Sequence, residues 1–216
     1  GANTFTATQT ISSGNLALPA TADQFNGVLT IAGNRFMHRF GSLSTFLGEN
    51  AGNFVSTGFG NSGFGAFALG SNTSGNNNTA SGNSALQSNT TGFANTANGK
   101  NALQLNTIGS SNTASGASAL ALNTSGENNT ASGASALQNN TLGNANTATG
   151  SAAMSGNTTG VSNTAMGVDA LFGNTAGSQN VAIGVSAGAT TNLSNRNTSR
   201  SSNTFLGAYS GPGTSA

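Results

Sequence analysis

The sequence predicts an all-β protein: a parallel β-solenoid, or β-roll, of about ten 17-residue coils behind an N-terminal β cap. Three observations support this fold class. A short phrase recurs every 17 residues, and glycine recurs at two fixed places within each repeat. Gly residues and Asn-Thr pairs also interrupt every run that could form a helix. We divide the chain into an N-terminal segment, residues 1–43, and a repeat array, residues 44–216.

The N-terminal segment lies outside the repeat and is typical of short strands. Thr4–Ile11 alternates as a strand does. Val28–Ile31 and Arg35–Phe40, separated by Gly33-Asn34, predict a β-hairpin. We expect this segment either to cap the first coil or to lend a strand to a neighbouring subunit.

The repeat phrase reads Asn-Thr-Ala-Ser-Gly-Asn-Ser-Ala-Leu where it begins at Asn78. Related phrases begin at Asn95, Asn112, Asn129, Asn146, Asn163 and Asn180, each 17 residues after the last. Phe-rich versions begin earlier, at Ser44 and Asn61. The final phrase begins at Asn203, because extra residues intervene around 193–200.

Two glycine columns follow from this register. The first is Gly48, Gly65, Gly82, Gly99, Gly116, Gly133, Gly150, Gly167, Gly184 and Gly207. The second is Gly58, Gly75, Gly92, Gly109, Gly126, Gly143, Gly160 and Gly177. A glycine fixed in every repeat indicates a turn that needs a positive φ or a close backbone approach. Two such corners divide the coil into unequal halves, each with room for one short strand.

An Ala-Leu column between the corners raises the alternative of helical repeats, because Ala and Leu are good helix formers. It runs from Ala68-Leu69 to Ala170-Leu171. No run of about 10 helix-forming residues exists, however, and helical repeat units are longer, roughly 33 to 47 residues. The β-solenoid is therefore favoured.

Stacked coils would place their strands about 4.8 Å apart, so ten coils would form a rod on the order of 45 Å long. We expect one asparagine column to form side-chain amide ladders at a turn. Its members are Asn72, Asn89, Asn106, Asn123, Asn140, Asn157 and Asn174.

The core offered by Ala, Leu and Thr looks thin, which predicts packing between chains, around a threefold axis or along a fibre. Large side chains gather towards the two ends of the chain. The candidate subunit-contact residues are Phe5, Ile11, Phe36, Phe40, Phe46, Phe64, Phe205, Leu206 and Tyr209.

Composition argues against several other classes of function. A net charge of +1, with 4% charged residues, does not favour binding to nucleic acid or an anionic membrane, and no apolar stretch is long enough for membrane insertion. The chain has no cysteine, its acids Asp23, Glu49, Glu127 and Asp169 are scattered, and His38 is its only histidine. We therefore expect no catalytic residues, no metal site and no cofactor, and assign His38 to the N-terminal cap.

Two binding functions remain as alternatives to a purely structural role. Two threonine columns, Thr79 to Thr164 and Thr73 to Thr175, form a regular polar array of a kind that suits ice binding, although threonine is also common in strands. Carbohydrate binding by Asn and aromatic groups is the other alternative, but the middle coils have few aromatic residues.

Asn180–Gly184 and Asn163–Gly167 resemble the head repeats of YadA-like trimeric autotransporter adhesins. The resemblance covers about residues 44–211 and implies a left-handed parallel β-roll, although coils in that family are usually shorter than 17 residues. Gly27–Ile31, Phe36–Gly41 and Thr45–Asn53 resemble bacterial secreted, tail-fibre-like proteins. Many of these end in a self-cleaving chaperone domain, so this resemblance implies that the chain is the released portion of a fibre.

The sequence therefore predicts a non-enzymatic structural protein, either an extracellular fibre or a cell-surface adhesin rod. Its expected partners are other copies of itself, in a homotrimer or a head-to-tail filament, and host or environmental glycans.

Overall fold

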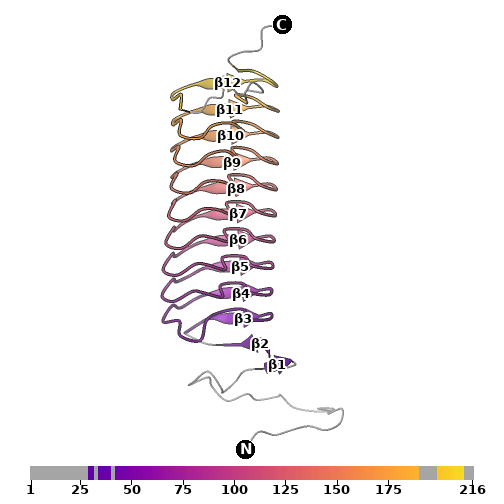
Figure 1. Cartoon of the computed structure of the whole chain (residues 1–216), viewed down its shortest axis with the longest axis vertical. Helices are drawn as coiled ribbons and strands as arrows, with labels where there is room; N and C mark the ends of the chain where they lie inside the picture. The colour runs from indigo at the N-terminus through magenta and orange to yellow at the C-terminus, as the bar shows by residue number, and fades with distance from the viewer. Residues whose placement is uncertain (1–28, 32–33, 40–41, 190–198, 212–216) are drawn as a thin grey trace, which may run out of the picture.

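The computed structural model describes residues 29–31, 34–39, 42–189 and 199–211. These residues form a straight rod of stacked coils, with one short strand in each coil (Figure 1). None of them forms a helix, so the β-solenoid prediction is confirmed and the helical alternative is wrong. No segment of the described chain is a helix long and apolar enough to cross a membrane.

All twelve strands belong to one sheet, in which they lie in chain order from β1 to β12. They are β1 (Leu29–Ile31), β2 (Asn34–His38), β3 (Thr45–Leu47), β4 (Ser62–Phe64), β5 (Thr79–Ser81), β6 (Thr96–Asn98), β7 (Thr113–Ser115), β8 (Thr130–Ser132), β9 (Thr147–Thr149), β10 (Thr164–Met166), β11 (Val181–Ile183) and β12 (Thr204–Leu206).

The strand register reproduces the period of the sequence. From β3 to β12 every neighbouring pair is parallel, and Thr113 pairs with Thr130 as Thr130 pairs with Thr147. The longer interval before the last strand does not disturb this register, because Val181 pairs with Thr204 directly. By contrast, β1 and β2 form the predicted antiparallel hairpin, and β2 pairs antiparallel with β3.

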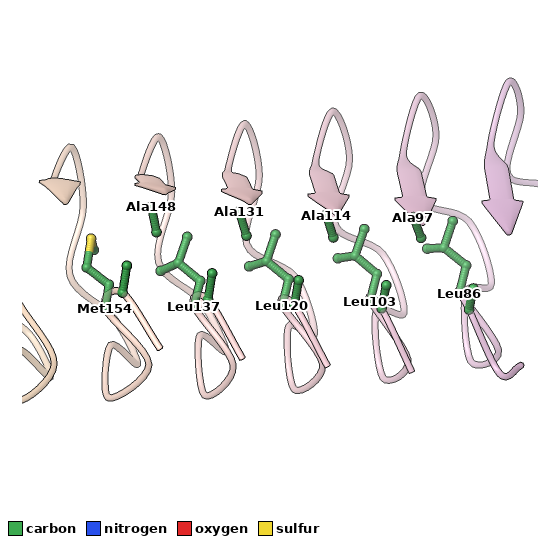
Figure 2. Close-up of a cluster of buried hydrophobic side chains, with 14 of the residues drawn as sticks. Leu86, Ala97, Leu103, Ala114, Leu120, Ala131, Leu137, Ala148 and Met154 are labelled. Carbon is green, nitrogen blue, oxygen red and sulfur yellow. The ribbon is translucent and has the colours of Figure 1, made fainter. Parts of the chain in front are cut away.

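The core is a stack of small layers that have nearly the same composition in the regular coils. In the coil of β7 the strand points Ala114 inward, and the opposite side of the coil contributes Ala119 and Leu120, all fully buried. Figure 2 shows the equivalent side chains in one row, from Leu86 to Met154, with the strand alanines from Ala97 to Ala148 in a second row that faces the leucines. A single chain therefore buries its own core, and no second copy is needed to cover it.

The two glycine columns have different physical roles. Gly116 and its equivalents have φ between +101° and +141°, where L side chains are strained. In the second column it is space that excludes a side chain. A Cβ at Gly126 would collide with the Asn123 side chain and with the Gly143 carbonyl oxygen of the next coil. Close backbone approach applies to the first column as well, since a Cβ at Gly116 would lie 2.5 Å from the Gly133 carbonyl oxygen, and the positive φ is an additional reason there.

The Ala-Leu half of the coil contains no strand, and here the sequence-based prediction was wrong. Ser118 and Leu120 both have a left-handed backbone, with φ of 58° and 52°, which cannot continue an extended strand. The backbone N–H and carbonyl groups of Leu120 are both hydrogen-bonded. The Leu120 N–H donates to the Ala136 carbonyl of the next coil at 3.0 Å, and the Leu120 carbonyl accepts from the Asn123 N–H at 3.1 Å.

Two asparagine ladders run through the interior of the rod. The predicted ladder, Asn72 to Asn174, is confirmed: from Asn89 onward each Nδ2 donates to the Oδ1 of the asparagine one coil earlier at 2.7–3.0 Å. The second ladder runs from Asn61 to Asn203. There each backbone N–H donates to the preceding Oδ1 at 2.9–3.1 Å.

The two ladders share an acceptor in every regular coil. The Gly126 carbonyl, for example, accepts Nδ2 of Asn123 at 3.0 Å and Nδ2 of Asn112 at 2.8 Å. Buried amides that are fully hydrogen-bonded keep the layers in one register, because a slip would leave them unpaired. Among the described residues, the Asn174 Oδ1 at the end of its ladder has no partner.

Candidate interaction surface

The N-terminal end of the solenoid is closed by the hairpin. The Gly48 N–H donates to the Phe36 carbonyl of β2 at 2.7 Å, and His38 lies opposite Phe46. His38 is 4% exposed, its Nε2 hydrogen-bonds to the Ala51 carbonyl at 2.7 Å, and its ring centroid lies 4.9 Å from that of Phe46. His38 is therefore a packing residue of the cap, as the sequence predicted.

Phe46 was predicted as a subunit contact, and the structure corrects this. Its side chain is 2% exposed and fills the interior of the first coil. Glycines make room for it, since a Cβ at Gly52 would lie 2.6 Å from the Phe46 Cγ and one at Gly63 would lie 2.8 Å from its Cδ1. In the regular coils a small alanine on the strand packs against a large leucine in the turn. The first coil reverses these sizes, because it has Phe46 on the strand and Gly52 in the turn.

The last coil, which begins at β12, repeats this reversal. Phe205 replaces the strand alanine and packs partly buried against the core. In the preceding coil, Gly188 occupies the position that leucine holds in the regular coils. It leaves space for Phe205, because a Cβ at Gly188 would lie 2.7 Å from the Phe205 ring. Phe205 therefore belongs mainly to the core, whereas Leu206 and Tyr209 are 66% and 65% exposed.

The outward-facing side chains of the third strand position form a continuous row, which we call the outer column. β2 contributes Met37 to it, because Met37 pairs with Leu47 and both are exposed. Towards the N-terminal end the column is apolar: Met37, Leu47 and Phe64. Its middle is polar: Ser81, Asn98, Ser115, Ser132 and Thr149. Towards the C-terminal end it is apolar again: Met166, Ile183 and Leu206.

The predicted contact residues thus have different positions. Phe36, Phe64, Leu206 and Tyr209 are exposed, and two of these belong to the outer column. Phe5, Ile11 and Phe40 lie outside the described residues, as does the strand predicted over Thr4–Ile11. The sequence analysis did not name Met37, Leu47, Met166 and Ile183 as candidate contact residues. On the parallel strands the outer column is the residue that directly follows the inward-facing one, so it can be recognised in the sequence once the strand has been located within the repeat phrase.

The two threonine columns differ in whether their side chains are free to contact a ligand. Thr113 and its neighbours on the strands are exposed, whereas the second column is engaged in the fold. Each of its hydroxyls from Thr73 to Thr158 donates to the threonine carbonyl of the next coil at 2.9–3.1 Å. This second column therefore stabilises the stack and offers no free polar array.

Across the described part of the chain, no three His, Asp or Glu side chains lie close enough together to hold a metal ion. The chain matches no protein-family model, no curated protein and no solved structure. The likeness of its repeat phrases to YadA-like heads therefore stays a prediction from the sequence.

Proposed function

We propose that this chain is a non-enzymatic structural protein, a rigid rod that associates with copies of itself in an extracellular fibre or a cell-surface adhesin. The observation that carries the proposal is the layered construction of the rod. Every regular coil presents to the next the same strand edge, the same two asparagine ladders and the same threonine hydroxyl. Such an array is stabilised by nearest-neighbour contacts and is extended by adding layers.

The edge of β12 supports association end to end. Within the array, the N–H of the first strand residue donates to the next coil, as the Val181 N–H does to the Asn203 carbonyl at 2.8 Å. The carbonyl of the third strand residue accepts from the next coil, as the Ile183 carbonyl does from the Gly207 N–H at 2.9 Å. In β12 the equivalent groups are the Thr204 N–H and the Leu206 carbonyl, and among the described residues no further coil pairs with them. A strand edge of this kind favours pairing with another chain.

The opposite end offers a strand of matching direction. Because β1 is antiparallel to β2 and β2 is antiparallel to β3, β1 runs in the same direction as the strands of the solenoid. Pairing of β12 with β1 of another copy would therefore continue the parallel sheet, with only β2 reversed at each junction.

Electron microscopy of the purified protein over a range of concentrations tests this function. We expect rods whose length grows with concentration. Thr204→Pro removes the N–H that β12 would donate to another copy and is expected to shorten the rods, whereas Thr204→Ala keeps that N–H and serves as the control. Compact monomers that do not associate at any concentration would contradict the proposal.

A further inference from the structure

The outer column has a symmetry that the solenoid itself does not require. Counted from Met37 to Leu206, it reads three apolar residues, five polar residues and three apolar residues. Ser115 of β7 is its midpoint, so Phe64 and Met166 lie equally far from the centre in opposite directions. Leu47 corresponds in the same way to Ile183, and Met37 to Leu206.

The six apolar members are all solvent-exposed, with exposed fractions between 38% and 66%. Apolar side chains that adjoin one another across strands form a patch, and patches of this kind mark interaction sites more often than scattered exposed residues do. Val168 and Val185, which follow β10 and β11 after the corner glycines, are also exposed, at 45% and 43%.

The strands of the solenoid offer little charge to a partner. None of the strands from β3 to β12 contains a charged residue, and the nearest charges are Arg35 of β2 and, beyond the glycine corner, Glu49 and Lys100. A charged partner would find no ion pair on the strands from β3 to β12. A second copy of the same neutral face would meet no repulsion, and sheets pack face to face at about 10 Å in just this way.

We infer that the outer column is an interface between two copies of this chain, packed strand face to strand face and running in opposite directions. A twofold axis at Ser115 would then place Leu47 of one copy against Ile183 of the other, and Phe64 against Met166. Such an interface is isologous, because the same surface serves both copies and the assembly closes at two. Both apolar ends are covered in one step, while the polar middle stays hydrated.

The palindromic pattern is what selects the antiparallel arrangement. Copies packed in parallel and in register would match any column with itself, so they would not require the two ends to resemble each other. Antiparallel copies do require it, and a shift by one coil would place Phe64 or Met166 against a polar residue. This inference rests on the proposed function to the extent that both need self-association, but it concerns the side of the rod and not its ends.

Cysteine cross-linking tests the arrangement, because the chain has no cysteine of its own. Leu47→Cys and Ile183→Cys are made in separate chains, one of them carrying a size tag, and are mixed and joined with a short bifunctional maleimide, because sheets about 10 Å apart hold the two Cα atoms too far apart for a direct disulfide. We expect the mixed 47–183 dimer to be the main product, at least about tenfold above the background given by Glu127→Cys, an exposed position outside the column. Main products of 47–47 and 183–183 would indicate parallel packing and overturn the inference.

A second measurement covers the case in which cysteine alters packing. By sedimentation, Ile183→Asp is expected to weaken the dimer at least tenfold, because it places an unpaired charge in the interface. Leu142→Asp, at an exposed apolar residue outside the column, is expected to leave dimerisation unchanged. If the protein still assembles but shows neither the mixed cross-link nor an effect of Ile183→Asp, this inference is wrong and the proposed function stands. If the protein is monomeric in every assay, both are wrong.

Discussion

The asparagine ladder gives the sharpest prediction, because two adjacent asparagines differ only in their surroundings. Asn140 is fully buried: its Nδ2 donates to the Asn123 Oδ1 at 2.8 Å, and its Oδ1 accepts from the Asn157 Nδ2 at 2.7 Å. Asn139 is exposed. Replacing each in turn with alanine removes the same side chain from the same turn, inside the rod in one case and outside it in the other.

The magnitude follows from the groups that lose a partner. Asn140→Ala leaves the buried Asn123 Oδ1 without its donor and one N–H of Asn157 without its acceptor. The Gly143 carbonyl stays hydrogen-bonded, because Asn129 also donates to it at 2.8 Å. Each unsatisfied buried group costs about 1–3 kcal/mol, so the free energy of unfolding should fall by about 2–6 kcal/mol. Asn139→Ala should change it by less than about 0.5 kcal/mol.

Urea unfolding followed by circular dichroism measures both variants under identical conditions. A repeat array need not unfold in two states, so the comparison is between midpoints and slopes of the two variants rather than absolute free energies. Equal and small shifts for Asn140→Ala and Asn139→Ala would refute the argument that the buried ladder stabilises the stack.

Three further pairs of substitutions test other parts of the coil. Leu120→Ala should lower the free energy of unfolding by about 2–5 kcal/mol through loss of a buried side chain, whereas Leu122→Ala in the same coil, at a 37% exposed residue, should have a small effect in the same urea titration. Gly126→Ala should strongly lower the melting temperature because its Cβ meets the backbone of the next coil, whereas a Cβ at Gly211 has its nearest neighbour at 3.6 Å, so Gly211→Ala should be tolerated. Gly52→Leu should destabilise the first coil, because the new side chain would clash with Phe46. Adding Phe46→Ala should restore much of the melting temperature, because the double variant has the Ala-Leu core of the regular coils. A double variant less stable than both single variants would contradict this description of the end coil.

The sequence predicted the fold because the features that determine it repeat. The period, the glycine corners and the Asn72 to Asn174 ladder were all visible as columns, and a column constrains the fold more than any single residue. The hairpin was predictable because it is a local feature with its own turn signal. The left-handed winding rests on the family resemblance alone and stays a prediction.

What the sequence did not reveal depends on backbone conformation and on which side a residue faces. Nothing in the residue type of Leu120 indicates a left-handed backbone, since leucine rarely adopts one. Phe46 looked like a contact residue because large side chains gather towards the two ends of the chain. Its burial depends on Gly52 and Gly63, which become its neighbours only after the coil closes. The outer column was likewise hidden until the three-residue strand could be placed on the repeat phrase.

Deletion of one whole coil is the most direct test of the central claim that the rod is a stack of interchangeable 17-residue layers. Removing residues 113–129 joins Asn112 to Thr130 and keeps every column in register, whereas removing residues 113–121 takes away fewer residues but leaves half a coil. Circular dichroism and small-angle scattering should show that the larger deletion folds into a rod shorter by about 4.8 Å and that the smaller deletion disrupts the array. A folded product from the half-coil deletion, or an unfolded one from the whole-coil deletion, would contradict the account.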